Sequence, residues 1–366
     1  MSPPLALAGP PGWLGRFRLS QARRRLQLAR YWQANGDLDE AARHASRALR
    51  LLDGRSVEVT GEAALTVADI ERDRCEYASS YTRLAGLAGQ LSAAAASGSA
   101  SQLLLARVLV SLGDAHRRSG QYRQATETLQ RACGLLGDTE PSLLAAALTT
   151  LAITHKEAGE FGQAHRLYKW VQQIRQESGA STGQQADLHH NLAGLAYAEQ
   201  YYEQAEQHAR EALALRRAAG ANAVGLAPER AVLAAALAAR HRYGEARLEL
   251  EGALAACRAS QPPRRYEIAV QLHTLAAVEQ ACGLADRAES LYREALALKE
   301  DLLGPGHPEV ALILNNLGSL LCEQHRRTEA VELFSRALAV AQGTLRPGHP
   351  TTAGIFRNLQ TVNGQV

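Results

Sequence analysis

The sequence predicts an all-α protein, an α-solenoid of antiparallel helix hairpins that follow one another along the chain. One observation behind this prediction is a short motif that recurs at a nearly constant period over most of the 366 residues. A second is the helical spacing of apolar residues on both sides of each copy. The third is composition. Hydrophobic residues make up 46% of the chain but aromatic residues only 5%, and alanine is abundant, which favours closely packed helices.

The recurring motif is a polar turn, an aromatic residue or leucine, two variable residues and an alanine, as in Gly120 to Ala125. Copies of the motif end at Ala41, Ala125, Ala164, Ala205, Ala246, Ala288 and Ala330. From the second of these onward, successive alanines are 39, 41, 41, 42 and 42 residues apart. A fixed period of this size is the signature of stacked repeats, each of which is one supersecondary unit.

Two apolar stripes accompany each copy. Upstream of the anchor alanine, apolar residues recur at positions i, i+3, i+4 and i+7, and the anchor with its fourth and seventh successors forms another stripe. Two helices therefore face each other across a turn. A small residue of the first helix is expected to lie against the second helix, which lets the backbones approach closely. The small residues at this position are Gly113, Ala152, Ala193, Ala234, Ala276 and Gly318.

These small residues, the anchor alanine and the aromatic residue four positions later resemble the tetratricopeptide repeat (TPR) family. The period exceeds the usual ~34 residues and is similar to the longer repeats of kinesin light chains and their bacterial look-alikes. Gly306-His307-Pro308-Glu309-Val310-Ala311, with Asn315-Asn316-Leu317-Gly318, carries this resemblance, and Gly348-His349-Pro350 repeats part of it. The resemblance is strongest over residues 266–366 and implies a right-handed superhelix. In the Gly-His-Pro element we expect proline to occupy the first position of a helix and histidine to mark its boundary.

The organisation predicted along the chain begins with a flexible leader, residues 1–19. Two helical hairpins follow at 20–91, the second degenerate because Glu62 and Asp69 stand where leucines are expected. The Ala/Ser/Gly-rich residues 92–101 are predicted to form a flexible loop or a slightly extended helix end. Six regular hairpins are predicted at 102–348, and a C-terminal capping helix with a polar outer face at 349–366.

Charge and cysteine content narrow the functional classes. The formal charge of +3 is too small in so long a chain to indicate nucleic acid or a membrane as a direct partner. The five cysteines are scattered, so neither a disulfide framework nor a metal site is expected. No signal peptide or long apolar run is evident, and a cytoplasmic location is expected. Only three of the 40 basic residues are lysines, which indicates a GC-rich bacterial source.

Catalytic motifs are not evident in the sequence. It contains no H-E-x-x-H, no G-x-S-x-G and no phosphate-binding loop. His189 and His190 are adjacent, so on a helix their rings point about 100° apart and do not form a facing ligand pair. We expect no enzyme, no cofactor, no metal and no small-molecule substrate.

The TPR resemblance implies a concave face lined by the first helix of each hairpin, at positions next to the packing stripe. Candidate peptide-binding residues at and beside these positions are Thr150, Asn191, Thr274, Asn315, Asn316 and Asn358. Asparagine is unfavourable inside helices, and its amide suits the backbone of an extended peptide because it both donates and accepts hydrogen bonds. The alternative is that Asn316 and Asn358 link neighbouring repeats.

Arginines of the N-terminal half, Arg107, Arg117 and Arg118, lie on the same predicted face and favour an acidic peptide. A solvated arginine face is an equal alternative. The leading hypothesis is a scaffold that binds an extended peptide or a partner helix in a concave groove. The second hypothesis is a peptide-sensing protein that controls a separate transcription factor or signalling partner.

Overall fold

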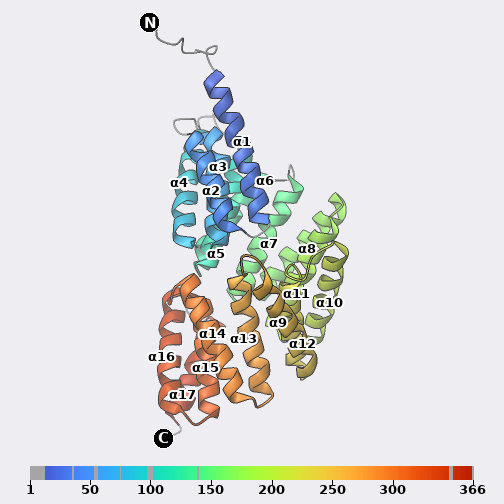
Figure 1. Ribbon diagram of the computed structural model, residues 1–366, viewed down its shortest axis with the longest axis vertical. Coiled ribbons are helices and arrows are strands. Elements are labelled where there is room, and N and C mark those ends of the chain that lie inside the picture. Colours follow the sequence, from blue (N-terminus) through green and yellow to red (C-terminus); the bar gives the residue numbers. More distant parts are fainter. Residues whose placement is uncertain are drawn as a thin grey trace, which may run out of the picture. The chain divides into compact units, whose positions relative to one another are not determined.

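The computed structural model describes residues 13–34, 37–52, 57–74, 76–96, 102–137, 140–345 and 349–364. Within these ranges the chain forms 17 α-helices and no β-strand (Figure 1). The predicted fold class, an all-α solenoid of helix hairpins, is therefore confirmed. The chain divides into two compact units, residues 1–112 and 113–366, with the boundary inside helix α5 (Gln102–Arg118).

None of the described helices is both long enough and apolar enough to cross a membrane.

The first unit contains two helix hairpins before α5. Its helices are α1 (Trp13–Ala34), α2 (Leu38–Leu51), α3 (Val57–Asp73) and α4 (Tyr77–Ala96). Alanines such as Ala29 of α1 and Ala41 of α2 are fully buried and let the two helices approach closely. Asp37 starts α2, where its carboxylate accepts a hydrogen bond from the Glu40 backbone N–H at 3.0 Å, as is typical of a helix N-cap.

One predicted segment of this unit is corrected. Residues 13–19 were expected in a flexible leader but belong to α1, because no proline interrupts them and Leu19 packs against Ala22 and its neighbours. Residues 92–96 continue α4, in agreement with the alternative of an extended helix end, because alanine is the strongest helix former. The remaining residues of both segments, 1–12 and 97–101, lie outside the described ranges.

The second unit continues from the end of α5 through the regular hairpins and a final unpaired helix. Its helices are α6 (Tyr122–Leu136), α7 (Pro141–Glu157), α8 (Phe161–Ser178), α9 (Thr182–Ala198), α10 (Tyr202–Ala218), α11 (Ala227–Ala239), α12 (Tyr243–Ala259), α13 (Arg265–Ala281), α14 (Ala285–Leu303), α15 (Pro308–Glu323), α16 (Arg327–Thr344) and α17 (Pro350–Asn363). The six hairpins predicted at 102–348 correspond to α5–α6 through α15–α16.

Each hairpin turns at the same position, five residues before its anchor alanine. The turn residue has a positive φ in all six hairpins, between 61° and 77°. It is glycine at 120, 159 and 283 but Gln200, His241 and His325 in the others. Glycine adopts this conformation without the steric cost that a Cβ imposes. The turn geometry is therefore a property of the repeat, and the choice of glycine varies from one copy to the next.

The predicted small-residue contacts are also present. The six anchor alanines are fully buried. A Cβ added to Gly113 would lie 2.5 Å from Leu129 Cγ, and one added to Gly318 would lie 2.9 Å from Phe334 Cε1. Both distances are shorter than carbon atoms tolerate, so these two positions are restricted to glycine by the packing of the facing helix.

The first helices of consecutive hairpins, α7, α9, α11, α13, α15 and α17, also contact one another in a row. Among the described residues, the second helices of consecutive hairpins make no comparable contacts. The row of first helices is therefore the more crowded, inner side of the second unit, as the repeat pattern implied.

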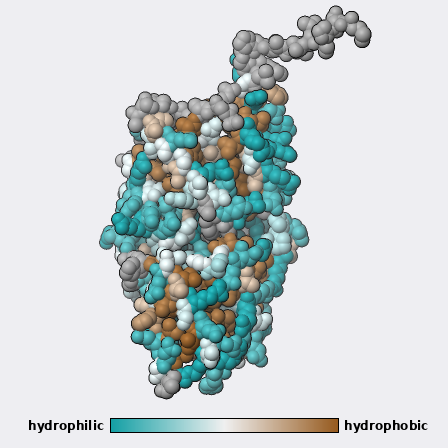
Figure 2. Space-filling model, turned by 90° about the vertical axis from the view of Figure 1, so that its left-hand side faces the viewer, coloured by the Kyte–Doolittle hydropathy of each residue, from teal (hydrophilic) through white to brown (hydrophobic). Residues whose placement is uncertain are grey.

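The final helix, α17, packs against α15 and α16. Its predicted polar outer face is interrupted by Phe356, which is 46% exposed. Figure 2 shows apolar side chains gathered in the lower part of the view, where the last helices of the second unit lie. The outer surface at this end is thus less polar than the sequence pattern indicated.

Candidate functional site

The inner face of the second unit encloses a cavity of about 830 Å³. Its wall comes from the turns after α5 and α7, from α9, and from the first turns of α11, α13, α15 and α17. Every inner helix from α7 to α17 therefore contributes to it. Cavities of this size fall within the range of ligand-binding pockets.

Two histidines connect the late inner helices to the early ones, so that the helices around the cavity form a closed ring. His307 and His349 precede α15 and α17, and the Nδ1 atom of each accepts a hydrogen bond from a backbone N–H of its own helix, at 3.2 and 3.1 Å. The Nε2 atom of each contacts a backbone carbonyl at the end of an inner helix: His307 that of Arg118, and His349 that of Glu157 at 2.5 Å. Each ring thus joins segments about 190 residues apart while it caps a helix.

The predicted boundary role of the Gly-His-Pro elements is confirmed, since proline begins α15 and α17 and histidine caps both. Sequence reasoning did not find their second contact. Their prolines meet the turn glycines of two early repeats: a Cβ added to Gly120 would lie 2.8 Å from Pro308 Cγ, and one added to Gly159 would lie 3.1 Å from Pro350 Cδ. The available signal was that the Gly-His-Pro element recurs, but nothing in its spacing identifies the partner.

An ion-pair network forms one side of the cavity. Arg117 is held between two carboxylates, with 2.7 Å from Nη2 to Asp114 and 2.8 Å from Nη1 to Glu157. Arg118 pairs with the second oxygen of Asp114 at 3.0 Å. Burial disfavours the charge of Arg117, but the two carboxylates outweigh it and raise the pKa of its guanidinium. Both predicted arginines therefore line the cavity, but they are already paired.

The opposite side carries a second cluster of charges. Lys299, whose side chain is 3% exposed, lies 2.5 Å from Glu309 and 3.4 Å from the centre of the Tyr266 ring. The Tyr266 hydroxyl also donates to Glu309, at 3.0 Å. Burial opposes ionisation of Glu309, but Lys299 nevertheless lowers the pKa of this carboxyl. The charge of Glu309 is thus neutralised inside the protein.

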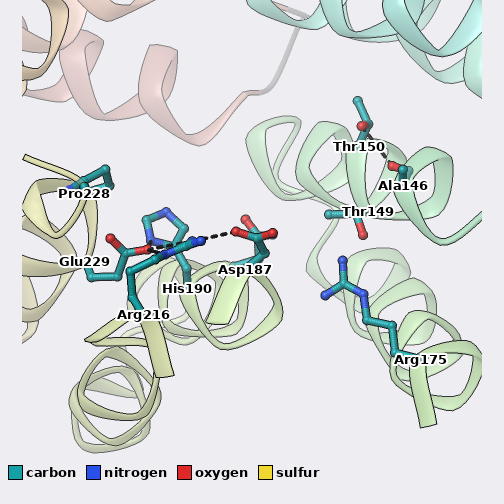
Figure 3. A pocket seen from close by; sticks show the side chains of 11 residues that line it. Ala146, Thr149, Thr150, Arg175, Asp187, His190, Arg216, Pro228 and Glu229 are labelled. Carbon is teal, nitrogen blue, oxygen red and sulfur yellow. Dashed lines mark hydrogen bonds and ion pairs between the residues drawn. The ribbon is translucent and has the colours of Figure 1, made fainter. Parts of the chain in front are cut away.

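A smaller cavity of about 420 Å³ adjoins the first and shares His190 and Pro228 with it (Figure 3). Two of the predicted binding residues, Thr150 and Asn191, are in its wall. In Figure 3 the Arg216 side chain extends between Glu229 and Asp187, and it pairs with them at 2.9 and 2.6 Å.

The other predicted asparagines form a chain of hydrogen bonds from repeat to repeat. Asn358 donates to Asn315 at 2.9 Å, Asn315 donates to Asn316 at 3.3 Å, and Asn316 Nδ2 lies 2.9 Å from His273 Nε2. We call Asn358, Asn315, Asn316 and His273 the amide ladder. The ladder corresponds to the alternative interpretation of the sequence, in which these asparagines link neighbouring repeats.

Two remaining predicted residues lie away from both cavities. The Thr274 hydroxyl donates to the Val270 carbonyl of its own helix at 3.0 Å. Arg107 belongs to the first unit, where it pairs with Glu62. The structure thus brings Thr150, Asn191, Arg117 and Arg118 to the two cavities and uses the others in packing.

The sequence matches the tetratricopeptide repeat family model over residues 267–343 and 309–359. The match covers α13 to α17, and the hairpins before them have the same helix–turn–helix form, so the chain contains tetratricopeptide repeats. No curated protein matches the sequence.

Two solved structures share the fold at low sequence identity, and a third is less similar. The Rap conjugation gene regulator of the plasmid pLS20, in complex with the Phr* peptide, is 13% identical over 91% of this chain and 96% of its own, with a TM-score of 0.65. The apo quorum sensor NprR from B. thuringiensis is 12% identical over 87% of both chains, with a TM-score of 0.61. Kinesin light chain TPR-like repeats from Podosopora anserina are 20% identical over 55% of this chain and 97% of theirs, with a TM-score of 0.42. Identity at this level shows the fold alone.

Proposed function

We propose that the second unit binds a short extended peptide in the cavity enclosed by its inner helices. The observation that carries this proposal is the cavity of about 830 Å³ whose wall is drawn from α7 to α17 and closed by His307 and His349. A partner helix is a poorer fit, because a helix is about 10 Å wide with its side chains and the ring is closed by direct contacts.

The wall offers both apolar and polar contacts. Tyr197 and Leu312, each 41% exposed, line the cavity. Exposed large apolar side chains gathered in a hollow are typical of binding sites. In the wall of the adjoining smaller cavity, Asn191 has no hydrogen bond to any other residue in the described part of the chain. Its amide is therefore available to donate to and accept from a peptide backbone, as the sequence pattern predicted.

The related folds support the same proposal. The pLS20 Rap structure contains a peptide, and NprR is described as a quorum sensor. In this chain the binding residues that we assign are Asn191 and Thr150, which line the adjoining smaller cavity, while Asn315, Asn316 and Asn358 link neighbouring repeats in the amide ladder. Arg117 and Arg118 keep their internal carboxylates and therefore add no net charge to the wall.

Capture of hexapeptide pools on the immobilised full chain tests this function. We expect a subset of peptides to be retained, and Asn191→Ala to weaken the best of them roughly 5- to 10-fold, because one or two neutral hydrogen bonds are lost. Asn363→Ala, at the exposed end of α17, is the matched control. Retention of no pool, or equal affinity for the Asn191 variant and wild type, would reject the assignment.

A second candidate function is control of a protein partner through the first unit. Residues 13–52 contain nine arginines and three carboxylates, a formal charge of +6 in a chain whose total is +3. Several of these arginines, including Arg16, Arg23 and Arg24, are exposed on α1. Such a surface favours a partner with an acidic face.

Affinity capture from cytosol with wild type and with an Arg16→Glu, Arg23→Glu, Arg24→Glu variant tests this second function. We expect a partner that wild type retains and the variant loses, and whose recovery changes when a captured peptide is added. Recovery of the same proteins by both chains would argue against it.

A further inference from the structure

Lys156 occupies an unusual place in the wall of the larger cavity. It belongs to the last turn of the inner helix α7, is only partly exposed, and lines the cavity directly. No described residue forms an ion pair or a hydrogen bond with its ammonium group. Burial lowers the pKa of Lys156. A half-buried ammonium without a partner is costly, so its presence requires a reason.

The other charged groups around the cavity are paired. Arg117 and Arg118 share Asp114 and Glu157, and Lys299 neutralises Glu309. These six groups and Lys156 comprise four cations and three carboxylates. The uncompensated positive charge of the wall therefore belongs to Lys156.

A second unsatisfied polar atom lies near this lysine. His190 Nδ1 is buried and has no hydrogen-bond partner among the described residues. The nearest carboxylate oxygen, Glu229 Oε1, is 3.9 Å away, beyond hydrogen-bond distance, and is bonded to Arg216. Burial lowers the pKa of His190, Glu229 opposes that shift, and the nearby charge of Lys156 adds to it. Lys156 and His190 Nδ1 thus border the same hollow without a hydrogen-bond partner among the described residues.

A glycine borders the ammonium group of Lys156. Gly194 lies one turn after His190 on α9, and a Cβ at this position would approach the Lys156 Nζ atom to 3.4 Å. Glycine inside a helix costs about 1 kcal/mol relative to alanine. At Gly194 it leaves the ammonium group accessible from the cavity.

We propose that Lys156, with His190 beside it, binds a carboxylate of the peptide ligand. This inference rests on the proposed function, since it names the chemical group that the same cavity recognises. The single uncompensated positive charge matches the single negative charge of a carboxylate. The apolar side chains of Tyr197 and Leu312 in the same cavity can pack against the hydrocarbon part of the peptide residue that carries this carboxylate. The carboxylate comes from the C-terminus of the peptide or from an Asp or Glu side chain.

Three hexapeptide pools separate these sources. The first has a free C-terminus and no acidic residue, the second has an amidated C-terminus and one Asp or Glu, and the third is amidated with no acidic residue. We expect the first or the second pool to be enriched at least about tenfold over the third on the wild-type chain, because a charge-assisted hydrogen bond is worth more than a neutral one.

Lys156→Met removes the charge at nearly constant volume and should abolish this enrichment, with a loss of about 10- to 100-fold in affinity. Lys169→Met is the matched control, because it removes the same charge from an exposed position on the outer helix α8. Lys156→Arg should retain part of the preference. Equal retention of all three pools by wild type and by Lys156→Met overturns the inference and leaves peptide binding intact, whereas retention of no pool counts against the proposed function.

A spectroscopic measurement tests the lysine independently of any particular peptide. The chain has only three lysines, Lys156, Lys169 and Lys299, so reductive ¹³C-methylation gives few NMR signals, and the variants assign them. N-acetyl-leucine supplies a carboxylate on an apolar residue, and N-acetyl-leucine amide lacks the charge. We expect the acid alone to shift the Lys156 signal and to raise its pKa. A signal that responds equally to both compounds, or to neither, contradicts the carboxylate site.

The stability of the Lys156→Met variant distinguishes a ligand-binding role of Lys156 from a structural one. If Lys156 served an internal ion pair, Lys156→Met would lower the urea midpoint of unfolding. The proposal expects a midpoint equal to or above that of wild type, because an unpaired ammonium group is removed from a partly buried position. A clear decrease in the midpoint would assign Lys156 to packing.

Discussion

The inner face of the second unit contains two regions with the same kinds of polar side chain but opposite states of pairing. On α13, α15 and α17, the amide ladder satisfies Asn315, Asn316, Asn358 and His273 within the protein. On α7 and α9, Lys156, His190 and Asn191 border hollows with atoms that no described residue satisfies. The comparison teaches that residue type and repeat position do not by themselves define a binding site. What defines it is the presence of polar atoms that form no hydrogen bond within the protein.

The two regions meet where the early turns contact α15 and α17. The closest of these contacts is between Gly120 and Pro308, and a substitution there should have the largest effect on stability. Gly120→Ala places a Cβ at a φ of 75° and 2.8 Å from Pro308 Cγ. We expect a loss of about 2–4 kcal/mol, the sum of a left-handed backbone cost and overpacking. Gly283→Ala has the same backbone cost at a φ of 77° but no neighbour within 4 Å, so it should lose only about 1–2 kcal/mol.

Urea unfolding of both variants measures the difference, which isolates the contact between the α5–α6 turn and α15. Equal losses in the two variants would mean that the early and late repeats are not held together at Pro308.

The paired region should make stability depend on pH. Burial, followed by the charge of Lys299, lowers the pKa of His273 to about 4. The folded state therefore binds fewer protons than the unfolded chain below pH ~6.5. The free energy of unfolding should fall as pH decreases from about 6.5 to about 4, by at most about 1.4 kcal/mol per pH unit from this group.

His273→Gln keeps a hydrogen-bonding side chain beside Asn316 and removes the titration, so the slope of stability against pH should flatten. The same slope in wild type and in His273→Gln would remove His273 from the explanation.

The smallest expected changes in stability come from the asparagines, and they should differ between the amide ladder and Asn191. Asn316→Ala leaves His273 and Asn315 without their partner and should cost about 1–3 kcal/mol with little change in peptide affinity. Asn191→Ala breaks no bond within the described chain and should change stability by less than about 0.5 kcal/mol. Chemical unfolding checks both values, and a reversed order would contradict the division between the regions.

The repeat pattern was sufficient for much of the architecture. The spacing of Ala125 through Ala330 predicted six hairpins, and the small residues Gly113 and Gly318 predicted where their helices meet. These are local features, because each depends on residues within about 20 positions of one another. The extension of α1 to Trp13 was missed because residues 13–19 were assigned to the leader, whereas the extension of α4 to Ala96 was predicted only as the alternative to a flexible loop.

The cavity could not be predicted in the same way. Its wall joins Arg118 to His307 and Glu157 to His349 across about 190 residues, and a periodic pattern does not state how many repeats complete a turn. Sequence reasoning identified Asn191 and Thr150 by their repeat positions but could not distinguish them from Asn316, whose partner belongs to the preceding repeat. Lys156 could not be singled out from the sequence, because its lack of a partner is a property of the folded chain.

Photo-crosslinking tests the central claim most directly. A hexapeptide retained by the full chain is resynthesised with a benzophenone side chain, irradiated in the complex, and its attachment sites are mapped by mass spectrometry. Peptide binding inside the ring predicts attachment near Tyr197 and Leu312 on the inner helices α9 and α15, and its loss in excess unlabelled peptide. Attachment at Trp170, 47% exposed on the outer helix α8, or within the first unit would contradict it.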